Sequence, residues 1–151
     1  MKDITLTFMS PNIVRGRELV AREAFEQAYE YFDTMLKSEP GNAIAKSYLG
    51  YLTAVFMKRP RQGLEICQEA ARMQGEEPLV CLNLAKVYII VEDRHSAIRT
   101  IQRGLQHRSS PYKLELLNFY RFLGVRRKPP LSFLDRSHPL NVLLGRLTKK
   151  R

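Results

Sequence analysis

The sequence of 151 residues contains no tryptophan, two cysteines and three histidines. The histidines are scattered and lack the paired spacing of zinc ligands, so we expect no metal and no other cofactor. No apolar run reaches the roughly 18 residues that cross a bilayer. The first residues, MKDITLTFMSPNIV, lack the uninterrupted apolar core and the cleavage pattern of a signal peptide. These absences predict a cytoplasmic protein.

Motifs of catalysis are also missing from the sequence. It has no glycine-rich phosphate loop, no nucleophile motif and no paired carboxylates at catalytic spacing. The acidic pairs Glu76-Glu77 and Glu92-Asp93 fall at expected unit boundaries and turns, where solvated charges are usual. We therefore expect that the protein is not an enzyme.

Cys67 and Cys81 lie inside apolar helical patterns, which predicts that both are small core residues in a reducing compartment.

Charge is unevenly distributed along the chain. The formal net charge is +10, but residues 124–151 hold eight basic residues against Asp135 alone. The basicity therefore belongs mainly to a C-terminal tail.

The central part of the chain repeats itself with a period of 34 to 35 residues. Repeats of this length are typical of helical arrays, in which each unit buries its apolar face against its neighbours. One extra residue in MKRPRQG makes the middle unit 35 residues long. The aligned pairs are Leu49 with Leu84, Gly50 with Ala85, Gly63 with Ala97, Cys67 with Ile101, Ala70 with Gly104, Ala28 with Gly63, and Phe32 with Cys67.

These units resemble the tetratricopeptide repeat, whose pattern has Leu-Gly/Ala, then Tyr, later Ala, an aromatic, a second Ala and Pro. The third unit matches best, through Leu84, Ala85, Tyr88 and Ala97, although Thr53 stands where the second unit should have its tyrosine. The resemblance implies an all-α fold, a right-handed superhelical stack of helix-turn-helix units. The expected repeat domain is 1–123, with units near 9–42, 43–77 and 78–111 and a capping helix at 112–123.

Small side chains explain why two helices of one unit can pack closely. Ala85 and Ala97 are expected to face each other, Tyr88 and Ile101 to fill the gaps to neighbouring pairs, and the polar residues 92–95 to form the turn. We expect helices at 13–22, 25–38, 43–57, 62–74, 79–91, 96–107, 112–123 and 139–148.

The resemblance also implies a concave groove lined by the first helix of each unit. Some family members clamp a C-terminal carboxylate there, but the matching positions hold Ile13, Arg17, Tyr48, Leu79 and Asn83, so that clamp is missing. An apolar groove favours binding of an apolar or amphipathic peptide segment. The protein is thus expected to be a scaffold, adaptor or chaperone-like module for another protein. The predicted groove residues are Ile13, Arg17, Val20, Ile44, Ser47, Tyr51, Val55, Leu79, Leu82, Lys86 and Ile89.

Residues 124–151 form a predicted basic tail with a short amphipathic helix. The Pro129-Pro130 pair prevents a preceding helix from continuing into the tail. Further on, leucines at helical spacing are followed by basic residues. The tail could cap the last repeat, dock as a lid on the repeats of its own or a second copy, or, as the alternative function, contact a membrane surface or nucleic acid. Nucleic acid is a less favoured partner than a membrane or another protein, because Phe133 is the only aromatic residue of the tail on which a base could stack. The predicted tail contacts are Leu140, Leu143, Leu144 and Leu147.

Overall fold

A computed structural model describes residues 11–107 and 110–124 of the chain. The chain divides into two units, Met1–Arg121 and Phe122–Arg151, so the description below concerns the first unit and the three residues that follow it. The described residues form seven helices and no strand, which confirms the all-α prediction. The predicted helix 139–148 lies outside these residues. The helices are α1 (Pro11–Ala21), α2 (Phe25–Ser38), α3 (Ala43–Val55), α4 (Pro60–Met73), α5 (Pro78–Ile90), α6 (Arg94–Gly104) and α7 (Lys113–Phe122).

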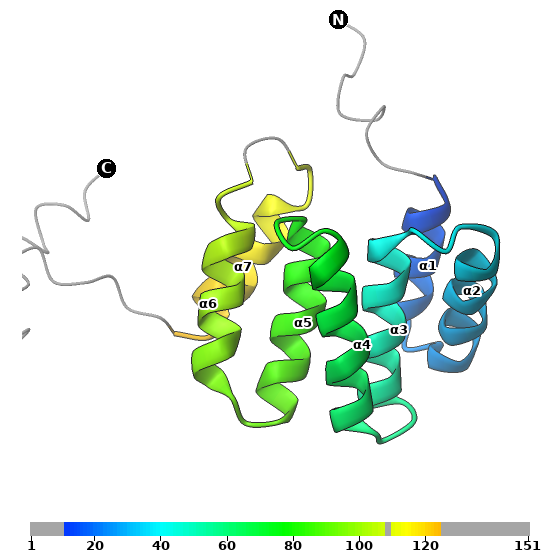
Figure 1. Cartoon of the computed structure of the whole chain (residues 1–151), viewed down its shortest axis with the longest axis horizontal. Helices are drawn as coiled ribbons and strands as arrows, with labels where there is room; N and C mark the ends of the chain where they lie inside the picture. The colour runs from blue at the N-terminus through cyan, green and yellow to red at the C-terminus, as the bar shows by residue number, and fades with distance from the viewer. Residues whose placement is uncertain (1–10, 108–109, 125–151) are drawn as a thin grey trace, which may run out of the picture. The chain divides into compact units, whose positions relative to one another are not determined.

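Six of these helices form three antiparallel pairs, α1–α2, α3–α4 and α5–α6, each joined by a short turn (Figure 1). Helix α3 contacts α2, α4 and α5, and helix α5 contacts α3, α4 and α6. The predicted boundaries agree with the observed ones to within three residues, and α2 begins and ends where it was predicted. In the described part of the chain, no helix is long and apolar enough to cross a membrane.

The turns inside the three pairs share one backbone feature. Each contains a residue other than glycine in the left-handed region: Glu23 with φ 58°, Lys58 with φ 57° and Glu92 with φ 64°. These residues are 35 and 34 positions apart, which is the period of the sequence repeat. The next residue in each turn precedes the second helix of its pair and is its N-cap. The repeat in the sequence therefore has a counterpart in the backbone.

The middle turn is one residue longer than the other two. The amide of Arg59 donates to the carbonyl of Thr53, whereas Ala24 and Asp93 donate to residues five positions earlier, Leu19 and Tyr88. The extra residue that the alignment placed in MKRPRQG is thus located in the α3–α4 turn. Helix α6 begins at Arg94, so the predicted turn at 92–95 ends two residues earlier than expected.

Close approach of backbones characterises the α3–α4 pair. A Cβ atom added to Gly63 would lie 2.5 Å from the carbonyl oxygen of Gly50, so the two helices touch through their main chains. The corresponding residues of the α5–α6 pair, Ala85 and Ala97, are both fully buried. The small residues aligned in the sequence therefore lie inside the unit in both pairs.

Both cysteines are buried and free, as predicted. The Cys67 thiol donates to the carbonyl of Ser47, and burial raises its pKa to about 12. The Cys81 thiol donates to the carbonyl of Gly75, and burial raises its pKa as well. Both thiols therefore stay protonated at neutral pH, and their role in this fold is to fill space.

Helix α7 is joined to the preceding pair mainly by side chains. Leu116 is fully buried, and one of its methyl groups would lie 2.7 Å from a Cβ atom placed on Gly104 of α6. The amide of Gln102 donates to the hydroxyl of Tyr120 at 3.3 Å. Glycine at position 104 therefore makes room for the leucine that anchors α7.

Candidate functional site: a charged cluster between alpha1, alpha3, alpha5 and alpha7

Arg17 of α1 connects three separate parts of the chain. Its Nε donates to the hydroxyl of Tyr48 on α3 at 3.1 Å, and its guanidinium forms an ion pair with Glu115 of α7. The guanidinium carbon also lies 4.8 Å from the centre of the Tyr112 ring, within the range of a cation–π contact. The two ends of the described unit are therefore linked through one side chain.

Lys86 of α5 belongs to the same cluster but forms no ion pair with a described residue. Its ammonium nitrogen lies 5.2 Å from the centre of the Tyr51 ring. Within the described part of the chain, no carboxylate lies within ion-pair distance of it, and the nearby Glu115 is already paired with Arg17. Burial lowers the pKa of Lys86, an effect that Glu115 opposes and Arg17 reinforces.

The tyrosines around these cations are neutral hydrogen-bonding groups. Burial raises the pKa of Tyr48 well above its ordinary value, and burial together with the negative charge of Glu23 raises the pKa of Tyr51. Tyr48 also stacks on Phe32 of α2, with ring centres 4.6 Å apart and planes 3° from parallel. Its hydroxyl is thereby held in a fixed position beside Arg17.

We use the name central cluster for Arg17, Tyr48, Tyr51, Lys86, Tyr112 and Glu115. Three of its members, Arg17, Tyr51 and Lys86, are among the predicted groove residues, and the structure brings them together. Glu115 and Tyr112 were not predicted, because they are 95 or more residues from Arg17 in the sequence and no local pattern connects them. A signal in the sequence was that Arg17 has no acidic residue three or four positions away, where a helical ion pair would form.

The other predicted groove residues separate into two groups. Four are buried: Ile13, Ser47, Leu79 and Leu82. Burial makes these side chains unavailable to a ligand. The Ser47 hydroxyl, for example, is fully buried, donates to the carbonyl of Ile44 and accepts from the amide of Asn83. The remaining residues besides the three cluster members are half-buried: Val20, Ile44, Val55 and Ile89. The predicted tail contacts Leu140, Leu143, Leu144 and Leu147 lie outside the described residues.

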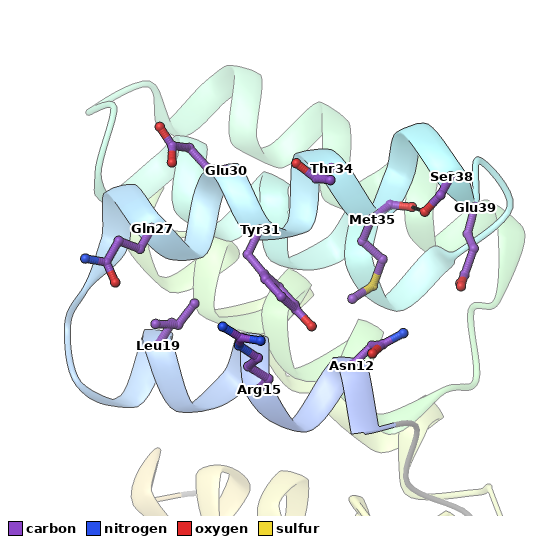
Figure 2. A pocket seen from close by; sticks show the side chains of 10 residues that line it. All are labelled: Asn12, Arg15, Leu19, Gln27, Glu30, Tyr31, Thr34, Met35, Ser38 and Glu39. Atoms are coloured by element: carbon purple, nitrogen blue, oxygen red, sulfur yellow. Dashed lines mark hydrogen bonds between the residues drawn. The ribbon is translucent and has the colours of Figure 1, made fainter.

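A separate pocket of about 510 Å³ lies between α1 and α2 (Figure 2). Arg15 and Tyr31 point toward each other across it, with the guanidinium carbon 5.8 Å from the ring centre. Leu19 and Met35 supply apolar surface, and the other lining side chains are polar. The sequence did not predict this pocket. The remaining lining residues are Asn12, Gln27, Glu30, Thr34, Ser38 and Glu39.

The central cluster combines cations, phenols and one paired carboxylate, which are groups that bind charged or polar ligands. Across residues 11–107 and 110–124 there is no group of three or more side chains that could hold a metal ion. What the central cluster can do is attract an anionic group to the uncompensated charge of Lys86.

Comparison with models of protein families and with curated proteins found no match for this chain. The resemblance to the tetratricopeptide repeat therefore continues to rest on the residues quoted from the sequence.

Proposed function

We propose that the protein is a non-catalytic interaction module of tetratricopeptide-repeat type that binds an amphipathic segment of another protein. Support for the repeat comes from the three left-handed turn residues Glu23, Lys58 and Glu92, which recur with the period of the sequence alignment. Stacks of such pairs commonly offer an extended binding surface on one set of helices. Here the corresponding set is α1, α3 and α5. Helices α1 and α5 contribute the cations of the central cluster, and α3 contributes two of its tyrosines.

The observation that carries the proposal is the half-buried, unpaired ammonium of Lys86. A partly desolvated cation is costly unless an anion or hydrogen bonds compensate it. In the described unit its ammonium lies over the ring of Tyr51, while Glu115 is engaged by Arg17. A ligand carboxylate at Lys86 would provide the missing compensation, so the bound segment carries an aspartate or glutamate.

The apolar part of the segment would contact half-buried side chains of the same three helices. Val20, Val55 and Ile89 retain partial exposure near the ends of α1, α3 and α5. Burial of apolar side chains contributes about 1.5–3 kcal/mol for each one fully removed from water. An amphipathic segment with one acidic side chain therefore fits the described residues better than a purely apolar segment.

Selection of peptides from a random display library tests this proposal. Peptides selected on the wild-type protein should contain an acidic residue flanked by apolar ones. Replacing that acid by its amide should weaken binding about tenfold, the usual worth of a hydrogen bond to a charged group. The same peptide change should have little effect on Lys86→Met, because the two changes remove one interaction.

Lys37→Met is the matched control, because Lys37 is exposed on α2 and paired with Asp33, away from the cluster. It should bind the selected peptides as the wild type does. Selected peptides without an acid, or equal binding to Lys86→Met and wild type, would overturn the proposal.

The pH dependence of binding gives a second readout on the same lysine. A carboxylate ligand stabilises the charged form, so the pKa of Lys86 is higher in the complex than in the free protein, where burial lowers it. Affinity should therefore be complete below the pKa of Lys86 in the free protein and be lost as pH rises through its pKa in the complex. Titration calorimetry at increasing pH measures this, and Lys86→Met should show no such fall.

A further inference from the structure

The turn between α3 and α4 places large apolar side chains next to basic ones at one end of this helix pair (Figure 1). Phe56 is 40 % exposed and Met57 is 37 % exposed, although both are large apolar residues. The basic side chains of Lys58, Arg59 and Arg61 follow directly along the chain and are exposed as well. We use the name α3–α4 tip for these five residues.

The backbone holds the α3–α4 tip in a fixed conformation. The amides of Phe56 and Met57 donate to the carbonyl of Leu52 at 2.8 and 3.3 Å, and the amide of Arg59 donates to the carbonyl of Thr53 at 3.1 Å. The turn is thus tied to the last residues of α3. The exposure of the apolar pair is therefore a property of the folded turn and not of a frayed helix end.

The α1–α2 turn shows that the fold does not require this composition. Counted from the left-handed residue, Ala21, Arg22 and Glu23 hold the positions of Phe56, Met57 and Lys58. The left-handed residues of the two turns have nearly the same φ, 58° and 57°. A turn of this kind therefore forms without large apolar residues and with an acid in place of the cation, so turn geometry does not explain the α3–α4 tip.

The positive charge of the α3–α4 tip is not compensated within the described residues. No ion pair involves Lys58, Arg59 or Arg61 in that part of the chain. The sequence has no acidic residue from position 40 to position 64. Three cations beside an exposed apolar pair are complementary to a partner that is both anionic and apolar.

We propose that the α3–α4 tip docks on the surface of an anionic lipid bilayer. Phe56 and Met57 enter the boundary between headgroups and acyl chains, where apolar side chains leave water. The three cations lie among the lipid phosphates and carboxylates, and each contributes about fivefold to the affinity for an anionic surface.

The shape and size of the α3–α4 tip favour a bilayer over a protein or a nucleic acid. A specific protein interface buries about 800 Å² on each partner, which two apolar side chains of a turn do not supply. The end of a helix pair is convex, and a fluid bilayer can enclose it without a matching hollow. The phosphates of a nucleic acid would engage the cations but would leave Met57 in water.

This surface is independent of the function proposed above. None of its residues belongs to the central cluster, and its partner is a lipid surface instead of an acidic peptide. It also differs from the membrane contact predicted for the basic tail, which lies outside the described residues. Failure of either proposal therefore leaves the other intact.

Tryptophan fluorescence of the full chain tests the proposal, because the protein has no tryptophan of its own. Phe56→Trp introduces a single reporter into the α3–α4 tip. We expect its emission to shift to shorter wavelength with vesicles of phosphatidylcholine and phosphatidylserine, and not with phosphatidylcholine alone. Lipids brominated in their acyl chains should quench it, because the ring lies at the edge of the apolar layer.

Met73→Trp is the matched control. Met73 is 41 % exposed and ends α4, the helix that begins next to the α3–α4 tip, so it lies at the opposite end of the same helix. Its tryptophan should not be quenched. Both variants keep the basic tail, so attachment through the tail alone would leave both reporters unquenched.

Charge variants give a second readout by cosedimentation with the same anionic vesicles. Lys58→Gln and Arg61→Gln should each weaken binding about fivefold. Arg72→Gln changes the net charge equally at the far end of α4 and should have little effect. Circular dichroism checks that each variant is folded.

Three results would overturn the proposal. They are an unquenched Phe56→Trp reporter, equal quenching of Met73→Trp, and an Arg72→Gln variant that weakens binding as much as Lys58→Gln does. A blue shift of Phe56→Trp with an oligonucleotide but not with vesicles would assign the α3–α4 tip to nucleic acid instead.

Discussion

The α1–α2 and α3–α4 pairs both have a buried glycine in the first helix, but they fill the space opposite it differently. A Cβ atom on Gly16 would lie 2.5 Å from the ring of Phe32, and one on Gly50 would lie 2.5 Å from the sulfur of Cys67. Gly16 and Gly50 are 34 residues apart, and Phe32 and Cys67 are the aligned residues of the second helices. The repeat therefore preserves the place of contact rather than the size of the residues that meet there.

The difference has a consequence for how each pair is stabilised. In α3–α4 the small Cys67 lets the main chains touch at Gly50 and Gly63. In α1–α2 the fully buried ring of Phe32 fills the contact and stacks on Tyr48 of α3. The space opposite the glycine is thus filled by an aromatic side chain in the first pair, whereas the backbones approach closely in the second.

The largest expected effect comes from removing that aromatic side chain. Phe32→Ala should lower the free energy of unfolding by about 3–5 kcal/mol, the range for buried phenylalanine. Cys67→Ala at the aligned position should cost far less, because only a sulfur atom is lost. Chemical denaturation measures both. Equal losses for the two variants would show that the pairs are stabilised in the same way.

Adding one methyl group at a glycine tests the other half of the comparison. Gly63→Ala forces α3 and α4 apart, because the new methyl would meet a carbonyl oxygen of the main chain that cannot move alone. Overpacking of this kind costs about 1–3 kcal/mol. Gly41→Ala is the control, since a Cβ atom there meets nothing within 4 Å. A denaturation midpoint for Gly63→Ala equal to that of Gly41→Ala would contradict the backbone contact.

Much of this arrangement could be predicted from the sequence, because it depends on local spacing. Apolar residues at helical periodicity and the repeat of 34 to 35 residues located the helices, and the aligned small residues Gly63 and Ala97 are buried as the repeat requires. Gly16 was not recognised, although it takes the place of Gly50 one period earlier. The first half of that unit lacks the Leu-Gly and Tyr residues that made the other units visible.

The central cluster could not be predicted in the same way. Arg17 and Glu115 are 98 residues apart, so their ion pair depends on how the helix pairs stack, which spacing within one unit does not determine. A step of one residue turns a helix position by about 100°, enough to move a side chain from the surface into the core. Even residues four positions apart, which share a helix face, can differ in burial. Ser47 and Leu82 are buried, whereas Tyr51 and Lys86 are half-buried.

The N-caps of the second helices extend the comparison to the α5–α6 pair. The carboxylate of Asp93 accepts from the amide of Ser96 at 2.9 Å, whereas the aligned N-cap of α4, Arg59, makes no side-chain cap. Arg59→Asp should therefore stabilise the protein by about 0.5–2 kcal/mol, the usual worth of an N-cap. Thermal unfolding measures the gain, and an unchanged or lower midpoint would contradict it.

Asp93→Ala is the reverse experiment and should lower the midpoint. The hydrogen bond from Ser96 lowers the pKa of Asp93, so its contribution is present above the ordinary aspartate pKa and lost as pH falls through the lowered value. The difference between wild type and Asp93→Ala should thus shrink in acid. A difference that stays constant with pH would assign the effect to the helix propensity of alanine.

The smallest expected effect concerns the left-handed residue that all three turns share. Lys58 has φ 57°, a conformation that costs a residue other than glycine roughly 1–2 kcal/mol. Lys58→Gly removes this strain but adds freedom to the unfolded chain, which offsets about 0.5–1 kcal/mol of the gain. The net stabilisation should therefore be about 1 kcal/mol or less. Lys58→Ala keeps the strain and should show no gain, which separates the backbone effect from loss of the lysine charge.

Two further variants decide whether the three turns are equivalent. Glu92→Gly, with φ 64° at the native residue, should gain about as much as Lys58→Gly, because both relieve the same backbone conformation. Glu65→Gly, in the middle of α4, should instead lose about 1 kcal/mol, since glycine there disfavours the helix. Denaturation of the four variants under one condition gives the comparison. If Lys58→Gly loses as much as Glu65→Gly, the left-handed turn carries no strain; if only one of the turn variants gains, the shared dihedral angle does not reflect a shared energy.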